Sequence, residues 1–358
     1  MILPGLVRLA LLRALRPAAC VVVAALLAWA LATSRASSTA LLAAGSDGAP
    51  LWEHGALRGS AWTIAALFGA GWLGLQALAT LPGWRRRDVD WMAPRGASAL
   101  ALVVSSWTGL VAAALVLGLA TAAAVEACAG RGSPSWIEGP PACSGPGAWV
   151  GFGEPSRELL ACGALPGGAR LRLSFAFGRG GPHVRVTASV LERPGGRELA
   201  RSEQSVGTQG ELELALPECP AGAELQLAIA EPGLRVYHDA PAARVWLPVA
   251  REGLASLSML AHLLLDAGSC CALALGLSGW FSTAGAALSL VALALIVLLS
   301  GAGADWLPLA DVFGALRVLQ EGRVPALPAL PQVAAAAALV AGGLALAALS
   351  LVRWRRER

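Results

Sequence analysis

Two ionisable side chains, His262 and Asp266, lie within a long apolar stretch in the last third of the chain. Residues four apart share one face of a helix, so these two side chains would lie one turn apart. A carboxylate at the centre of a membrane helix costs roughly 2.5–3.5 kcal/mol to insert, so it is expected to face other helices and to have a partner. The pair is therefore either a polar or proton-sensitive element of a transport path, or a hydrogen-bonded pair that fixes helix contacts.

A short charged loop, residues 83–97, separates two apolar runs at 59–82 and 98–125. Neither run contains Asp, Glu, Lys or Arg, and each exceeds the roughly 20 residues that a membrane helix needs. Such a loop, held between two rigid helices, can transmit force from a partner that changes shape. Alternatively, its arginines only fix the topology. The candidate coupling residues are Arg85, Arg86, Arg87, Asp88, Asp90, Trp91 and Arg95.

Four of the seven cysteines lie outside the apolar stretches, in one long polar region. They are Cys128, Cys143, Cys162 and Cys219. An even set of cysteines outside the membrane predicts disulfides, with three possible connectivities. Free thiols are the alternative, and no CxxC or HxxxH spacing supports a zinc site.

The chain contains no lysine, since all 27 cationic residues are arginine. A phosphate-binding G-x-x-x-x-G-K-[ST] loop is therefore excluded, and any ATP hydrolysis must come from another chain. No G-x-S-x-G motif occurs, and His183 and His238 are interpreted as surface histidines rather than catalytic ones. The arginines form no long basic tract, so nucleic acid is not an expected partner. We expect no enzyme activity, no bound cofactor and no metal in this chain.

The composition indicates a membrane protein. Hydrophobic residues make up 56% of the chain and charged residues 14%, with a mean hydropathy of +0.63, whereas soluble domains are about 25% charged. Residues 1–16 predict an amphipathic surface helix. The first span is placed at 17–34, and 35–58 is predicted to be an outer loop. The second span, 59–82, contains the cluster Gly69, Gly71 and Gly74, where a neighbouring helix could approach closely. The third span is 98–125.

The region 253–304 is long enough for two helices, with a break predicted within 276–285. Residues 305–323 predict a second amphipathic segment, and 332–352 the last span. Between the third and fourth spans, residues 171–177, 184–190, 211–216 and 225–229 alternate apolar and polar side chains as strands do. The predicted fold is a six-helix membrane bundle with an inserted all-β domain, sandwich-like or jelly-roll-like. Its parts are 1–126, 127–252 and 253–358.

Arginine clusters at 8–16, 85–95 and 353–358 fall on one side of this arrangement. Because cationic short loops usually lie in the cytoplasm, both termini are predicted to be cytoplasmic and 127–252 extracytoplasmic. Arg317 and Arg323 fall on the opposite side, and two residues do not outweigh three clusters. The arginine-rich, lysine-free composition favours a bacterial inner membrane protein.

The order of these parts resembles the membrane subunit of a type-2 ABC exporter. The segment 87–95 is similar to the family's acidic, apolar, proline and arginine segment before helix three. Residues 272–290 resemble its small-residue turn between helices four and five, and 353–358 its closing tail.

This resemblance implies a permease that forms the translocation path and pairs with itself or a sister permease within membrane lipid. A separate ATP-binding subunit would dock on the loop 83–97 and use ATP there. The alternative from the residues alone is a polytopic sensor or assembly protein that displays the β domain and transports nothing.

Overall fold

The structure is a computed structural model. It describes residues 2–43, 49–87, 98–129, 135–141, 143–144, 148–151, 156–160, 169–177, 183–192, 196–207, 211–216, 224–229, 235–238, 244–249, 253–299, 308–320 and 323–357. The chain divides into two compact units. One is helical and comprises Met1–Ala40, Leu51–Ser133 and Gly253–Arg358, and the other comprises Leu41–Pro50 and Pro134–Glu252.

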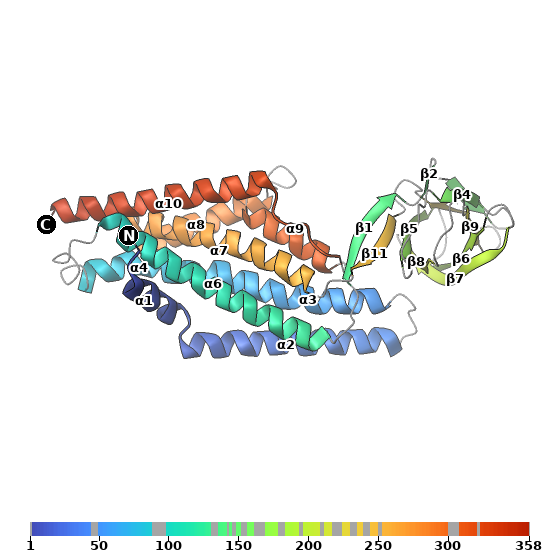
Figure 1. Cartoon of the computed structure of the whole chain (residues 1–358), viewed down its shortest axis with the longest axis horizontal. Helices are drawn as coiled ribbons and strands as arrows, with labels where there is room; N and C mark the ends of the chain where they lie inside the picture. Colours follow the sequence, from blue (N-terminus) through green and yellow to red (C-terminus); the bar gives the residue numbers. More distant parts are fainter. Residues whose placement is uncertain are drawn as a thin grey trace. The chain divides into compact units, whose positions relative to one another are not determined.

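The helical unit begins with a short helix, α1 (Pro4–Ala14), which meets α2 (Pro17–Ala43) at a bend of 50°. A long helical segment then runs through α3 (Ala49–Phe68), the π-helical turn η1 (Gly69–Leu73) and α4 (Gly74–Arg87). The remaining helices are α6 (Ala99–Ala129), α7 (Leu254–Trp280), α8 (Thr283–Leu299), α9 (Pro308–Gln320) and α10 (Leu330–Glu357). Both ends of the chain lie at the same end of this unit (Figure 1).

Four helical segments are long and apolar enough to cross a membrane: Leu57–Trp84, Ala99–Cys128, Leu254–Trp280 and Leu330–Glu357. The bent pair α1 and α2 makes a fifth if it counts as one span. In α8 the apolar stretch that qualifies is Thr283–Leu293, which is shorter than the roughly 20 residues of a standard span. Among the described residues, the expected multi-pass helical architecture is therefore present, and the count of six is not confirmed.

Several predicted boundaries hold. The amphipathic N-terminal segment is helical as α1, and the second amphipathic segment is α9. The break predicted within 276–285 occurs at Phe281, whose backbone is extended, before α8 begins at Thr283. Each of these boundaries had a local signal, namely an apolar periodicity or a cluster of small residues.

Two helices extend beyond the predicted apolar spans. The helix expected to stop at Pro82 continues to Arg87, although proline removes one backbone hydrogen bond inside a helix. Trp84, which is 2% exposed, packs into the core and holds the turn after the proline. The predicted outer loop 35–58 is largely helical, because α2 runs to Ala43 and α3 starts at Ala49.

The second unit contains two antiparallel sheets. Its strands are β1 (Ser135–Pro141), β2 (Cys143–Ser144), β3 (Ala148–Gly151), β4 (Ser156–Leu160), β5 (Arg170–Phe177), β6 (His183–Leu191), β7 (Glu198–Gly207), β8 (Glu211–Ala215), β9 (Glu224–Ile229), β10 (Arg235–His238) and β11 (Arg244–Val249). One sheet has the order β1-β11-β5-β10-β3, with β8 also paired to β5, and the other has the order β2-β4-β9-β6-β7.

The period-2 pattern of the sequence corresponds to the buried faces of these sheets. In β6 the side chains of Val184, Val186, Ala188 and Val190 are buried, while that of Arg185 is exposed. The neighbouring strand β9 alternates in the same way and places Leu225 opposite Val190. The turn that closes β6 onto β7 uses Gly196, whose φ of 63° lies in the left-handed region that favours glycine. The predicted β insertion is therefore confirmed.

Candidate functional site

The helix α7 is the centre of the helical unit, because α4, α6, α8, α9 and α10 all pack against it. Figure 1 shows it lying between α6 and α10. Gly276 allows one of the close contacts with α10, since a Cβ there would lie 2.8 Å from the carbonyl oxygen of Gly343. On another side, the indole Nε1 of Trp107 in α6 donates to the carbonyl oxygen of Gly268 at 2.9 Å. Any polar group on α7 is therefore placed among neighbouring helices.

Four polar side chains follow one another along α7 at intervals of four residues: Ser258, His262, Asp266 and Cys270. We call these residues the α7 polar row. His262 is 3% exposed and Asp266 is 1% exposed, as the sequence predicted for groups that must avoid lipid. Sequence analysis identified these two, whereas Ser258 and Cys270 were missed as members of the row. The four-residue spacing was the signal that could have found them.

The first half of the α7 polar row is bound to the segment that connects α9 to α10. The hydroxyl of Ser258 donates to the carbonyl oxygen of Ala326 at 2.9 Å, and Nε2 of His262 lies 2.8 Å from the same oxygen. Two donors on one carbonyl satisfy both of its lone pairs. They join the central helix to the chain just before the last span, so a change at His262 would be transmitted to that segment.

The second half of the α7 polar row contains the carboxylic acid, Asp266. The thiol of Cys270 donates to Oδ1 of Asp266 at 3.6 Å. A sulfur donor at this distance is a weak hydrogen bond, so it stabilises an ionised carboxylate only slightly. Chemically, the α7 polar row can hold or release a proton, or it can fix helix positions, and both interpretations from the sequence are compatible with this geometry.

We predict that Asp266→Asn separates these two interpretations. Asparagine keeps the shape of the side chain and its hydrogen-bonding oxygen but cannot ionise. If the row is a proton-sensitive gate, the variant loses transport in reconstituted vesicles while its melting temperature in detergent stays close to wild type. Full transport by Asp266→Asn would eliminate the gate and leave a structural role.

A second polar cluster, which sequence analysis missed, joins α3, α6 and α7. The guanidinium Nη2 of Arg58 lies 3.9 Å from Oε2 of Glu126, and the Ser256 hydroxyl donates to Oε1 of Glu126 at 2.7 Å. Arg58 is only 5% exposed. The predicted outer loop 35–58 includes Arg58, because this residue stands just before an uncharged run. The structure places Arg58 inside α3, which starts at Ala49.

The candidate coupling loop is described only at its edges. The backbone of α4 is helical through Arg85, Arg86 and Arg87, and α6 begins at Ala99, where the Ser98 hydroxyl accepts a hydrogen bond from the Ala101 backbone N–H at 3.1 Å. The other predicted coupling residues, Asp88, Asp90, Trp91 and Arg95, lie outside the described residues. The loop thus connects the last turn of α4 to the first turn of α6, and both turns are helical.

The cysteine prediction stays open. Cys128 lies in the last turn of α6, and Cys143 in β2 pairs by its backbone with Leu160. Cys162 and Cys219 lie outside the described residues. Among the cysteines whose side chains the structure describes, which are Cys20, Cys128, Cys270 and Cys271, no disulfide is formed. The described residues contain no group of three or more His, Cys, Asp or Glu side chains that could hold a metal ion.

Fold and site together define a helical protein of membrane character, with several apolar spans and an inserted β domain. No protein-family model and no curated protein matches the chain. Among solved structures, an arabinose-bound α-L-arabinofuranosidase aligns with 34% of this chain and 28% of its own, at 12% identity and a TM-score of 0.20. A likeness at that score carries no argument about fold or function.

Proposed function

We propose that this chain is the permease subunit of an ABC transporter, and that it exports its substrate. The observation that carries the proposal is the position of the loop 83–97, which connects the end of α4 to the start of α6. The end of α4 and the start of α6 lie at the same end of the helical unit as both chain termini (Figure 1). The loop therefore shares its side with the arginines of α1 and α10, where a cytoplasmic ATPase would dock.

The buried Trp84 gives this loop a mechanical connection. Its indole is 2% exposed and belongs to the same core cluster as Leu275 of α7 and Leu351 of α10. A push on the loop would therefore reach the central helix through close-packed side chains, which move together rather than deform independently. This packing favours a coupling role over one in which the arginines only fix topology.

The proposed arrangement is multi-pass in a bacterial cytoplasmic membrane, with cytoplasmic termini and the β domain outside. We infer six spans, with α8 as the fifth. Its 17 residues correspond to about 26 Å of helix, close to the hydrocarbon thickness of roughly 30 Å. Two copies of the chain, or one copy and a sister permease, would line the path, and the separate ATP-binding subunits would use the ATP.

The test is a measurement of ATPase activity in the reconstituted complex. Arg86→Ala and Asp90→Ala are each expected to reduce stimulation of ATP hydrolysis by substrate, by an amount within the usual coupling range of about 1–3 kcal/mol. Membrane insertion and expression should not change, because neither residue lies within the apolar runs.

The control is Arg201→Ala, which removes an exposed cation from β7 in the second unit. It should leave stimulation intact, since only charge is lost and not a loop contact. Unchanged coupling in Arg86→Ala and Asp90→Ala would contradict the docking role. It would favour the other class of function, a sensor or assembly protein that displays the β domain.

A further inference from the structure

A crevice lies between α1, α4 and α6, and of the residues that line it the proposed coupling mechanism uses only Trp84. Its lining consists of Leu6, Leu9, Ala10, Arg13, Gln76, Thr80, Trp84, Ser106 and Leu110. Arg13 is the one charged residue in this lining, and the other polar groups are an amide, two hydroxyls and an indole. A site with one cation, neutral polar groups and apolar walls is suited to a ligand that is both anionic and partly apolar.

The wall formed by α1 is held rigidly. A Cβ at Gly109 of α6 would lie 2.6 Å from both the Ala10 Cβ and the Val7 carbonyl oxygen, so the two helices are in backbone contact. The N–H of Leu3 donates to the Ser105 hydroxyl at 2.8 Å. At the other end, the indole of Trp72 donates to the Ala14 carbonyl oxygen at 2.9 Å. The position of Arg13 on this helix is therefore preorganised.

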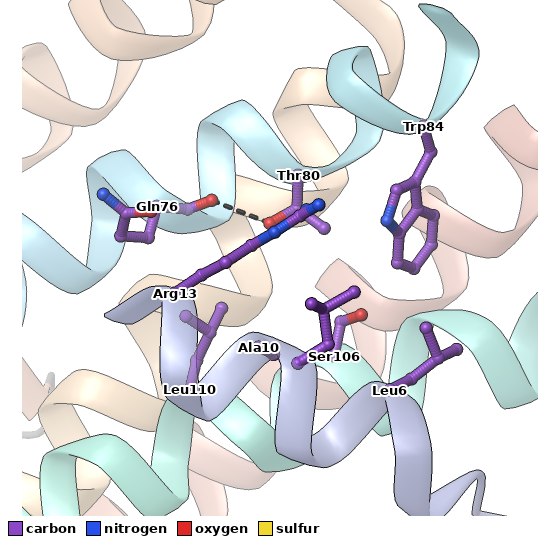
Figure 2. A pocket seen from close by; sticks show the side chains of 9 residues that line it. Leu6, Ala10, Arg13, Gln76, Thr80, Trp84, Ser106 and Leu110 are labelled. Carbon is purple, nitrogen blue, oxygen red and sulfur yellow. Dashed lines mark hydrogen bonds between the residues drawn. The ribbon is translucent and has the colours of Figure 1, made fainter. Parts of the chain in front are cut away.

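Figure 2 shows the Arg13 side chain extending from α1 across the crevice toward Gln76 and Thr80 of α4, with Trp84 at the far end. The Thr80 hydroxyl donates its proton to the backbone carbonyl oxygen of Gln76 at 2.7 Å, so an anion here would be bound by N–H donors such as the Arg13 guanidinium and the Gln76 side-chain amide. A guanidinium presents five N–H donors in a planar fork that matches the oxygens of a phosphate. The polar end of the crevice therefore has the chemistry of a phosphate site.

The apolar end of the crevice opens onto a surface of membrane character. Leu9 lines the crevice and is 38% exposed, and Leu12, further along α1, is 58% exposed. A free phosphate ion would gain nothing from these side chains, whereas an acyl chain would lie against them. Amphipathic helices with cationic and apolar faces commonly lie at the level of lipid headgroups.

We propose that this crevice binds an anionic phospholipid, with the phosphate on Arg13 and an acyl chain along Leu9. The proposal depends on the membrane character of the helical unit and is independent of the ABC assignment. Bound lipid would add a contact between α1 and α4, next to the coupling loop.

The test uses the full chain in detergent micelles and counts retained lipid by native mass spectrometry. Phosphatidylglycerol is expected to be retained more strongly than phosphatidylcholine. Arg13→Gln is expected to reduce this preference roughly tenfold, which is the loss of one charge-assisted phosphate contact. Arg13→Lys should retain part of it, because an ammonium binds phosphate without the bidentate fork. The control is Arg8→Gln, an exposed cation on the same helix that does not line the crevice.

A second variant keeps the test valid if Arg13→Gln fails to fold. Gln76→Glu preserves side-chain shape and places a carboxylate beside Arg13, so it should reject phosphatidylglycerol without lowering the melting temperature. Equal losses in Arg13→Gln and Arg8→Gln would overturn the proposal, because binding would then follow overall charge. Displacement of the lipid by millimolar inorganic phosphate would also overturn it, since the site would then take a free anion.

Discussion

Gly343→Ala is expected to lower the melting temperature of the detergent-solubilised protein by roughly 5–10 °C, because overpacking typically costs about 1–3 kcal/mol. A Cβ at Gly343 would collide with the carbonyl group of Ala272 in α7 and would lie 2.9 Å from the backbone nitrogen of Leu273. These contacts are with backbone atoms, which cannot rotate away as a flexible side chain can. The two helices would have to separate, and α7 would lose its closest neighbour.

The matched control is the adjacent glycine. A Cβ at Gly342 would have no heavy atom within 4 Å, and this residue is exposed on the same helix. Gly342→Ala should leave the melting temperature unchanged or raise it slightly, since alanine favours helix by about 1 kcal/mol relative to glycine. Similar melting temperatures for the two variants would contradict the close α7–α10 packing.

Glu126→Ala is expected to have the second large effect, a loss of about 1–3 kcal/mol in the free energy of unfolding. The substitution removes the carboxylate beside Arg58, which is 5% exposed, and the acceptor of the Ser256 hydroxyl. Breaking a buried ion pair from one side is strongly destabilising, because the remaining charge keeps its desolvation penalty. The loss is smaller than for a fully buried pair because the Glu126 side chain is 34% exposed and the charged atoms lie 3.9 Å apart.

The control for this prediction is an ion pair of similar chemistry at the surface. Arg353 Nε and Glu357 Oε1 are 2.7 Å apart, and both side chains are more than half exposed. Glu357→Ala should cause no measurable change, since water screens exposed pairs. Equal stability of Glu126→Ala and Glu357→Ala would show that Arg58 does not depend on its neighbour in α6.

Local patterns in the sequence were sufficient to predict most helices and strands, and insufficient to predict some of their boundaries. Alternation predicted β5, β6, β8 and β9 because a half-buried strand has period 2. The glycine cluster in the second span was interpreted as a site of close approach. Within this chain that is confirmed for Gly69, where a Cβ would lie 3.0 Å from Leu263, whereas a Cβ at Gly71 or Gly74 would meet nothing within 4 Å.

At the candidate site, the sequence was likewise sufficient to predict which residues are buried and insufficient to predict their partners. The burial of His262 and Asp266 followed from the energetics of charge in lipid, which depend only on their place in an apolar run. The partner of His262 did not follow, because Ala326 is 64 residues away and is brought to it by the packing of α9 and α10. Similarly, no local signal pairs Arg58 with Glu126 or directs Trp72 toward Ala14, since these contacts arise from tertiary structure.

The most direct test of the proposed function is affinity purification of this chain from its native membrane in mild detergent, followed by identification of the proteins retained. The account predicts stoichiometric recovery of a subunit that contains a G-x-x-x-x-G-K-[ST] loop. It also predicts loss of that subunit when residues 85–91 are replaced by a neutral linker of equal length. Recovery of the intact chain without any nucleotide-binding subunit, under conditions that preserve its fold, would contradict the account.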